Sequence, residues 1–369
     1  MQEKQYPFFI KSTVILFGII LLSYALINLR DILVPVAFSV IIAILLNPLV
    51  NRFKKYKVSH MFSIIFAMLI AILVFASILY FLSSQIAGFG ENLPILKSKF
   101  ASILHQLQQW VQMKFGIAID KQVQMLNDAL KNSKALVGQT VGTALGTLAV
   151  IFLLPVYVFL LLFYKALILN FLYEVFAEEN TRQVGDILSQ TKTAIQSYMV
   201  GLLLEALIVA IMNSAALMIL GIDYAILLGV IGAILNMIPY LGGIIAIALP
   251  VLMATVTKDG FSSQLGVIIA YAIIQFIDNN ILVPRIVSSK VEINALFSIL
   301  VVLFGGALWG VPGMFLSIPA VAILKIIFDR IDDLKPWGKL LGDEVPTRHK
   351  GQIWMRRRKK HSVAEKIVE

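Results

Sequence analysis

Long apolar runs alternate with short charged turns at the start of the chain. Uncharged runs cover Ser12 to Leu29, Ile32 to Val50 and Met61 to Phe81. Each is close to the roughly 20 residues that an α-helix needs to cross a bilayer. The first run lacks the small-residue cleavage site of a signal peptide, so we expect it to be retained. The pattern predicts an N-terminal region of membrane helices in residues 1–87.

Residues 88–140 are too polar to span a membrane, yet they keep a helical spacing of apolar side chains. Phe100, Leu104, Leu107 and Val111 recur every third or fourth position. This spacing is typical of one apolar helix face. We therefore expect an extramembrane amphipathic helical insert that packs on the bundle or lies at the lipid headgroups, rather than a ligand-binding module.

Two later apolar segments, residues 224–257 and 293–324, are longer than one crossing and are interrupted in the same way. In each, a break rich in glycine and proline is followed by apolar residues and another proline. Irregular backbone persists at membrane depth only where protein or water satisfies it, and paired breaks point to a transporter's binding site. Each segment is either one kinked crossing or a hairpin that enters and leaves on one side. The predicted hinge positions lie in these two segments, and Pro284 is added from the polar run between them. They are Pro239, Gly242, Gly243, Pro284, Gly310, Pro312, Gly313 and Pro319.

Residues 141–333 form the predicted membrane transport core, in which a mixed-charge segment at 165–192 is expected to be a cytoplasmic connecting helix. The span that follows carries Glu205 near its middle, on a stripe with Gly201 and Asn213 at steps of four residues. An ionisable side chain at the bilayer centre costs roughly 2.5 to 3.5 kcal/mol, so it usually faces the bundle interior. Glu205 is therefore either a proton or cation carrier or half of a structural polar contact.

A second polar run, Asp278-Asn-Asn280, follows Gln275 inside apolar sequence. In an α-helix Asp278 and Arg285, seven positions apart, would share one face and could form an ion pair or a gate. Pro284 would leave the carbonyl of Asn280 without its helical partner. The amides could coordinate a polar solute or make hydrogen bonds between helices. The predicted pathway and ion-coupling residues are Glu205, Asp278, Asn279, Asn280, Arg285, Gln275, Asn213 and Asn236.

Composition identifies the class of protein. With 59% hydrophobic residues, 14% charged residues and a mean hydropathy of +0.88, the chain is expected to be an all-α polytopic membrane bundle of about eight membrane segments, two of them broken or re-entrant. There is no cysteine, and the four histidines lie outside the long apolar runs. Thiol chemistry is therefore excluded, the histidine positions argue against an intramembrane histidine metal site, and we expect no metal and no cofactor. The chain has no G-x-x-x-x-G-K-[ST] phosphate loop, so ATP is not an evident driver.

The distribution of positive charge predicts the orientation. The segment from Asn51 to Lys57 holds four positive charges and no negative one, so we expect this loop and both termini to be cytoplasmic. The net charge of +10 is concentrated in a basic cytoplasmic tail, residues 334–369. Beside a membrane, such a tail is expected to meet anionic lipids rather than nucleic acid. The residues expected to do so are Arg356, Arg357, Arg358, Lys359 and Lys360.

Three short segments carry a resemblance to a known family. Ile238 to Gly243, Asp278 to Arg285 and Gly305 to Pro319 resemble the signature segments of the autoinducer-2 exporter (AI-2E) family of bacterial membrane transporters. The order of the parts along nearly the whole chain is also similar. The resemblance implies about eight membrane helices, homo-oligomers, a multi-pass protein of the bacterial inner membrane, and transport. It further implies export of the quorum-sensing signal or, in some branches, exchange of sodium or lithium for protons.

Three functional hypotheses follow. The first is a permease that exports a small polar solute similar to autoinducer-2, coupled to an ion gradient through Glu205 or Asp278. The second is a sodium or lithium/proton antiporter in which these carboxylates bind cation and proton competitively. The third is a membrane scaffold that transports nothing. An intramembrane enzyme is not expected, because no histidine base and no suitable aspartate pair lies within a span.

Overall fold

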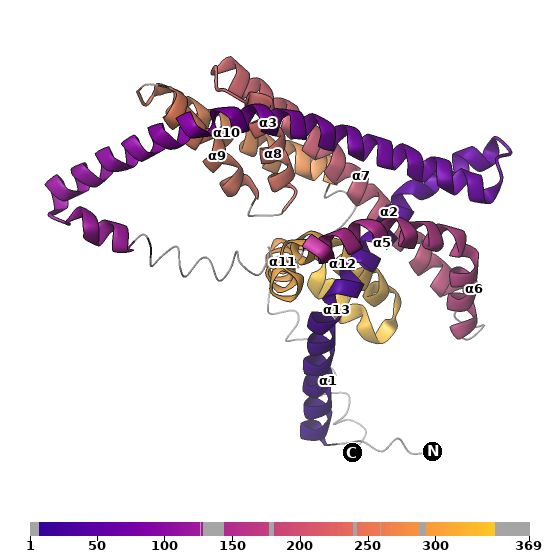
Figure 1. Ribbon diagram of the computed structural model, residues 1–369. Coiled ribbons are helices and arrows are strands. Elements are labelled where there is room, and N and C mark those ends of the chain that lie inside the picture. The colour runs from indigo at the N-terminus through magenta and orange to yellow at the C-terminus, as the bar shows by residue number, and fades with distance from the viewer. Residues whose placement is uncertain are drawn as a thin grey trace.

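The described parts of the chain are almost entirely helical (Figure 1). The computed structural model describes residues 7–125, 127, 144–176, 181–238, 242–258, 260–287 and 293–343, and no strand occurs among them. Five of its helices are long and apolar enough to cross a membrane, or up to six if the bent pair α5 and α6 counts as one span. The all-α polytopic prediction is thus confirmed. The helices are α1 (Phe8–Asn28), α2 (Arg30–Lys55), α3 (His60–Phe115), α5 (Ala144–Phe163), α6 (Lys165–Val175), α7 (Thr181–Ile219), α8 (Ala225–Asn236), α9 (Gly242–Thr257), α10 (Ser262–Ile277), the π-helix η2 (Asp278–Val287), α11 (Ala295–Trp309), α12 (Val311–Arg330), the short 3₁₀-helix η4 (Asp332–Leu334) and α13 (Lys335–Leu341).

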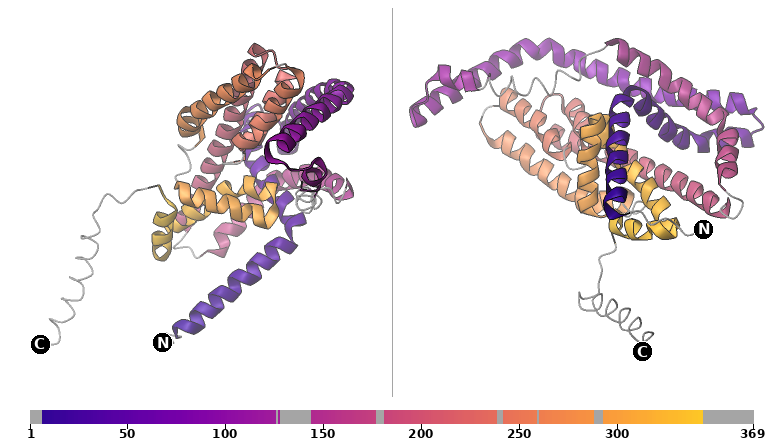
Figure 2. Two further views of the ribbon diagram at one scale, coloured as in Figure 1. Left: turned by 90° about the vertical axis from the view of Figure 1, so that its left-hand side faces the viewer. Right: turned by 90° about the horizontal axis from the view of Figure 1, so that it is seen from below.

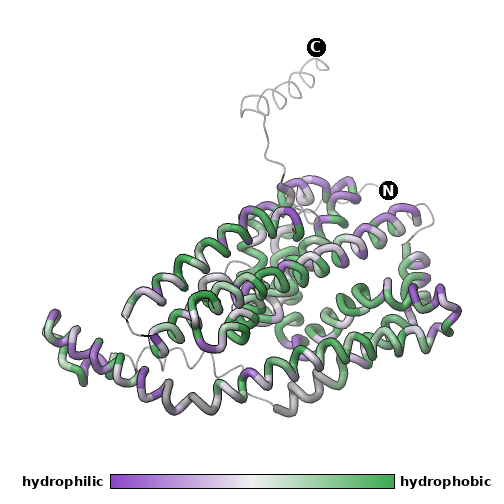
Figure 3. The backbone as a smooth tube through the Cα atoms, turned by 90° about the horizontal axis from the view of Figure 1, so that it is seen from above, coloured by the Kyte–Doolittle hydropathy of each residue, from purple (hydrophilic) through white to green (hydrophobic). Residues whose placement is uncertain are grey.

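The third apolar run and the predicted insert form one continuous helix. α3 extends over 56 residues and ends where Gly116 adopts a left-handed conformation, with φ of 67°. A residue without Cβ adopts this conformation at little cost, which is why glycine commonly ends a helix. Figure 3 shows the far segment of α3 mixing polar and apolar residues, whereas the part over the bundle is largely apolar. The change from membrane run to amphipathic insert therefore occurs within α3, without a break near residue 88.

The predicted connecting helix at 165–192 is two helices. α6 is bent by 64° from α5, and α7 begins a new helix at Thr181. α7 then continues for 39 residues through the position of Glu205. The same helix thus joins the charged connecting segment to the membrane span.

Both interrupted segments are hairpins rather than kinked crossings. At the first turn, a Cβ on Gly242 would collide with the carbonyl oxygen of Leu235, so α9 returns against the end of α8. At the second, Gly305 of α11 and Gly313 of α12 face each other backbone to backbone, and each would collide with the other's carbonyl if it carried a Cβ. Small residues permit such close backbone approach between membrane helices.

The two hairpins are anchored at opposite ends of α7. The open end of α11–α12 lies at the start of α7, where Gln183 Nε2 donates to the carbonyl of Arg330 and Arg330 Nη1 lies 3.4 Å from Asp186 Oδ2. α8 instead packs along the second half of α7, with Gly229 against Ser214. The end of α8 reaches the middle of α7, where Asn236 meets Glu205.

α1 extends away from the other helices (Figure 2). Its end is tied to α11 by Trp309, whose Nε1 donates to the carbonyl of Leu26 at 2.9 Å. Most of its apolar side chains are exposed. Such a surface suits contact with lipid tails, because every backbone polar group within a helix is already paired.

Candidate functional site

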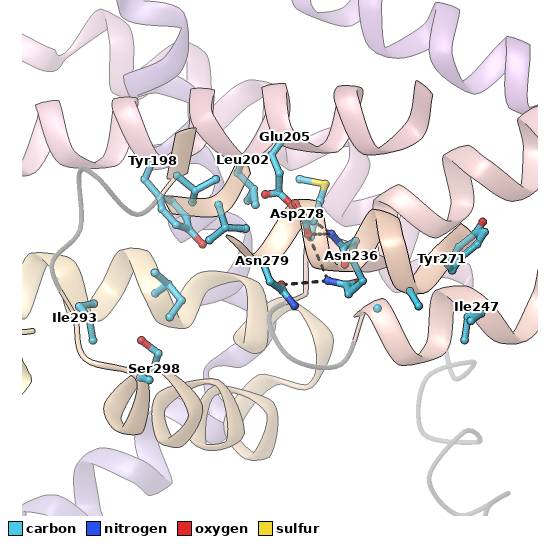
Figure 4. A pocket seen from close by; sticks show the side chains of 18 of the residues that line it. Tyr198, Leu202, Glu205, Asn236, Ile247, Tyr271, Asp278, Asn279, Ile293 and Ser298 are labelled. Atoms are coloured by element: carbon cyan, nitrogen blue, oxygen red, sulfur yellow. Dashed lines mark hydrogen bonds between the residues drawn. The ribbon is translucent and has the colours of Figure 1, made fainter. Parts of the chain in front are cut away.

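An acid, an amide and a second acid from three separate helices meet inside the bundle (Figure 4). Asn236 Nδ2 donates to Glu205 Oε1 at 3.2 Å and to Asp278 Oδ2 at 2.8 Å. Glu205 is 3% exposed and Asp278 is 2% exposed. Two carboxylates that share one donor repel each other when both are ionised, so a proton or a cation between them stabilises the group. We call Glu205, Asn236 and Asp278 the acid–amide–acid bridge.

Helix geometry explains why these three side chains meet. Glu205 lies on the stripe of α7 predicted to face inward, and Gly201, Val209 and Asn213 on that stripe are also buried. Gly201 lets η2 approach, because a Cβ there would collide with the carbonyl oxygen of Ile286. Asn236 ends α8 and Asp278 begins η2, so both amide and acid lie where the regular helix stops.

The π-helix removes the predicted pairing of Asp278 with Arg285. Asp278 is buried, whereas Arg285 is exposed and makes no ion pair with it. A π-helix pairs each carbonyl with the N–H five residues later instead of four. Seven positions therefore no longer return to one face, and the missing N–H of Pro284 no longer falls on the carbonyl of Asn280. The expected ion pair between Asp278 and Arg285 is therefore not formed in this structure.

The other predicted amides separate into two groups. Gln275 Nε2 donates to Asn279 Oδ1 at 3.2 Å and lies 3.4 Å from Asp278 Oδ2, beside the bridge. Asn280 instead is exposed and donates to the carbonyl of Phe276, four residues earlier at the end of α10, at 2.8 Å. Asn280 therefore faces away from the bridge, whereas Gln275 and Asn279 lie beside it.

A pocket of about 850 Å³ contains the bridge. Sequence reasoning missed several of its polar side chains, notably Tyr198 and Tyr271. Each tyrosine precedes an acid of the bridge by seven residues, Tyr198 before Glu205 and Tyr271 before Asp278. Two helical turns return to nearly the same face, so this spacing was a usable signal. Ser298 and Asp343 also line the pocket, and no local pattern pointed to them.

A second, much smaller cavity of about 10 Å³ lies behind the bridge. Three buried oxygen atoms without a hydrogen-bond partner among the described residues belong to side chains that line it, namely Asn213 Oδ1, Tyr271 Oη and Asp278 Oδ1. A void of this size is close to that of one water molecule. Oxygen atoms of carboxylate, amide and hydroxyl groups are also the ligands that hard cations prefer.

The predicted hinge residues have different positions relative to the pocket. Gly243 lines it, and a Cβ there would collide with Gln275 Oε1. Gly310, with φ of 65°, Pro312 and Gly313 form the turn of α11–α12, but none of them lines the pocket. Pro319 is buried within α12.

Other predictions lie outside the described residues. These are Pro239 and the five basic residues Arg356, Arg357, Arg358, Lys359 and Lys360. Among the ranges that the structure describes, no group of three or more acidic or histidine side chains converges as a metal site. The chemistry of the bridge rests on its two acids and on the amide and hydroxyl groups around them.

Comparison with known proteins places the chain in a family. The model of the AI-2E family transporter matches residues 12–333. The chain is 28% identical to YueF of Bacillus subtilis (strain 168) over 311 residues, covering 80% of this chain and 82% of that protein. It is 26% identical to the AI-2 transport protein TqsA of Escherichia coli (strain K12) over 317 residues, covering 85% of this chain and 90% of TqsA. The chain therefore belongs to the AI-2E transporter family and is a multi-pass membrane transporter.

Proposed function

We propose that this protein exports a small polar solute through the 850 Å³ pocket and couples the movement to an ion gradient at the acid–amide–acid bridge. The observation that carries the proposal is the burial of two carboxylates around one amide, within the pocket itself. Buried acids in a membrane bundle mark proton and ion pathways more often than structural contacts. The scaffold hypothesis is disfavoured, because a packed scaffold would not need a cavity that contains two buried acids.

The pocket has the size and polarity that a small hydroxylated solute requires. Ligand pockets commonly enclose roughly 300 to 1,000 Å³. Hydroxyl, amide and acid groups line this one among apolar side chains, so a solute could both donate and accept hydrogen bonds. The Escherichia coli relative is named for transport of AI-2. AI-2 is therefore the first solute to test here.

The two hairpins support alternating access. The pocket extends from Glu205 to Ile293, Ser298 and Asp343. Asp343 belongs to the C-terminal segment 334–369, which is predicted to be cytoplasmic. Its other boundary includes Met237 and Gly243 at the turn of α8–α9. A solute would load from the cytoplasmic side, and movement of the two hairpins relative to each other would open the pocket to the other side.

The proposal is tested with purified full-length protein in liposomes preloaded with AI-2. We expect efflux to accelerate several-fold when an inward proton or sodium gradient is imposed, and to depend on the protein. Liposomes with the same gradient and no protein provide the control. No protein-dependent efflux of AI-2 or of similar small polyols under either gradient would contradict solute export.

The small cavity supports a second candidate function, sodium or lithium/proton antiport. Its unpartnered oxygens include Oδ1 of Asp278, while Oδ2 of the same carboxylate belongs to the bridge. A cation in the small cavity and a proton on the bridge would therefore compete for one carboxylate. Proton movement driven by sodium without any solute would favour antiport over solute export.

Asn213→Leu separates the cation site from the solute pocket, because Asn213 lines the small cavity alone. Loss of one amide oxygen is worth about 1 kcal/mol, so the sodium concentration for half-maximal transport should rise roughly fivefold. Solute concentration dependence should not change. Asn280→Leu, which alters an exposed amide bonded only to the nearby carbonyl of Phe276, is the matched control. Equal effects of the two substitutions on sodium dependence would remove the small cavity from ion binding.

A further inference from the structure

Every charged side chain that lines the large pocket, among the described residues, is an acid. Glu205 and Asp278 belong to the bridge, and Asp343 follows the end of α13. No lysine, arginine or histidine of the described ranges joins them there. Even with one proton shared on the bridge, two of these three carboxyl groups keep a negative charge. The described wall of the pocket is therefore electronegative.

Asn294 holds the segment that carries Asp343. Its Nδ2 donates to the carbonyls of Leu340 and Gly342 at 2.8 and 3.1 Å, and its backbone N–H donates to the carbonyl of the residue between them at 3.0 Å. Its Oδ1 also accepts from the backbone N–H of Phe297 at 3.1 Å and so caps α11. One asparagine thus fixes the start of α11 to the end of α13.

This connection places Asp343 at the entrance of the pocket. Ile293, which precedes Asn294, and Ser298, one turn further along α11, both line the pocket. Figure 4 shows Ser298 and Tyr271 on opposite sides of the bridge. Asp343 is exposed and makes no ion pair with any described residue. A solute that enters from the end marked by Ser298 therefore meets the Asp343 carboxylate before it reaches the bridge.

The acid inside the pocket is also open to a donor. Asp278 is 2% exposed, and its Oδ1 has no hydrogen-bond partner among the described residues. An anionic group placed beside this carboxylate would lose its hydration and meet repulsion, whereas an ammonium or hydroxyl group would donate to it. A cleft lined by one sign of charge also concentrates solutes of the opposite sign.

We propose that the pocket accepts neutral or cationic hydroxylated solutes and rejects anionic ones, such as carboxylates and phosphate esters. Asp343 makes this selection at the entrance, and Asn294 is its positioning residue. The inference rests on the proposed function, because it defines the class of solute that this same pocket would carry. Polyols and amino polyols fit the class, since their hydroxyl and ammonium groups can donate to the acids.

A single Ser298→Cys substitution tests the charge of the pocket, because the natural chain has no cysteine. The full-length protein in detergent is treated with a cationic and an anionic methanethiosulfonate reagent of similar size. Each rate is divided by the rate of the same reagent with a small free thiol. Thiol reactivity affects both rates equally, so their ratio reports charge selection. We expect the corrected rate to be at least about tenfold higher for the cationic reagent.

Equal corrected rates would overturn the inference, whatever the outcome of the transport assay. A retained preference for the cationic reagent without any efflux of AI-2 or similar polyols would instead contradict only the proposed solute export. Efflux of AI-2 together with equal corrected rates would contradict only the charge selection. The two proposals therefore fail separately.

Protection of the same thiol tests the class of solute. Sorbitol, glucamine and gluconate share a carbon skeleton but are neutral, cationic and anionic, respectively. We expect sorbitol and glucamine to slow modification by an uncharged methanethiosulfonate several-fold, because they occupy the pocket beside Ser298→Cys. Gluconate at the same concentration should leave the rate unchanged. Protection by gluconate equal to that by glucamine, or protection by none of the three, would overturn the assignment.

Further substitutions, made together with Ser298→Cys, test the residues named. Asp343→Asn should lower the ratio of cationic to anionic rates about threefold, whereas Asp223→Asn, which alters an exposed acid outside the pocket, should not change it. Asn294→Ser keeps an oxygen that can cap α11 but removes the amide donors to α13, so it should also lower the ratio.

Equal ratios for Asp343→Asn and Asp223→Asn would remove Asp343 from the selection. A ratio that Asn294→Ser leaves unchanged would remove the positioning role of Asn294, because a purely structural change slows or speeds both reagents alike. Thermal unfolding of each variant in detergent confirms that the compared proteins are folded.

Discussion

Asp278→Asn is expected to lower ion-coupled transport roughly 10- to 100-fold without destabilising the protein. Asp278 borders both the pocket and the small cavity and accepts a hydrogen bond from Asn236 at 2.8 Å. A hydrogen bond to a charged group contributes about 1.5 to 3 kcal/mol, and each 1.4 kcal/mol is a factor of ten in binding. The asparagine keeps the shape of the side chain but cannot carry a proton or neutralise a cation.

Stability separates a transport role of Asp278 from a structural one. Removing a buried charge from an apolar interior is often neutral or stabilising, since the charge no longer needs compensation. We therefore expect the midpoint of thermal unfolding to stay constant or rise while transport in liposomes is lost. A structural contact would give the opposite result, with a lower midpoint and transport that falls only in proportion to the folded fraction.

Asp223→Asn provides the matched control for this measurement. Asp223 is an exposed acid in the turn between α7 and α8, outside the pocket. The same change of charge there should leave the transport rate within about twofold, because exposed charges away from a site contribute little. If Asp223→Asn and Asp278→Asn slowed transport equally, the loss would reflect net charge and not the acid–amide–acid bridge.

Side chains that depend on a regular α-helix were predictable from the sequence. Glu205 and Asn213 lie on a stripe of period four, and α7 buries that stripe as expected. The apolar spacing between Phe100 and Val111 likewise belongs to one helix, α3. In both cases the helix is unbroken, so the spacing of residues in the sequence determines which side chains share a face.

The prediction failed where backbone geometry depends on partners distant in sequence. η2 lies against Gly201 of α7, and its π-helical turns place Arg285 away from Asp278. The sequence left the choice between a kinked crossing and a hairpin open for the same reason. Composition is identical in both arrangements, and only the contact of Gly305 with Gly313 distinguishes them.

The acid–amide–acid bridge shows how much of the site the residue types alone can predict. Each of its members was predicted as a candidate because a polar group in apolar sequence is costly. Their meeting could not be predicted, because Glu205 and Asn236 are 31 residues apart and Asn236 and Asp278 are 42 apart. Only the hairpin of α8–α9, which returns its turn to the middle of α7, brings them within hydrogen-bond distance.

Gly305→Ala is expected to destabilise the α11–α12 hairpin strongly. A Cβ at Gly305 would stand 2.8 Å from the carbonyl carbon of Gly313 and 3.1 Å from Ser317 Cβ, with the Gly313 oxygen closer still. The obstacle is mostly backbone, so the two helices must separate along their whole contact. Overpacking of this kind costs about 1 to 3 kcal/mol, and the upper end applies where no side chain can rotate away. Thermal unfolding in detergent should show a midpoint lower by several degrees.

Gly306→Ala is the matched control, because it adds the same methyl group one position further along α11. There the added Cβ would meet the side chain of Met314, whose terminal methyl is 2.5 Å away and can move by rotation. The unfolding midpoint should therefore change by no more than about 1 °C. A single kinked crossing would leave α11 and α12 end to end, so neither glycine would face the other helix. Equal midpoints for Gly305→Ala and Gly306→Ala would consequently reject the hairpin, and a large difference between neighbouring positions would support it.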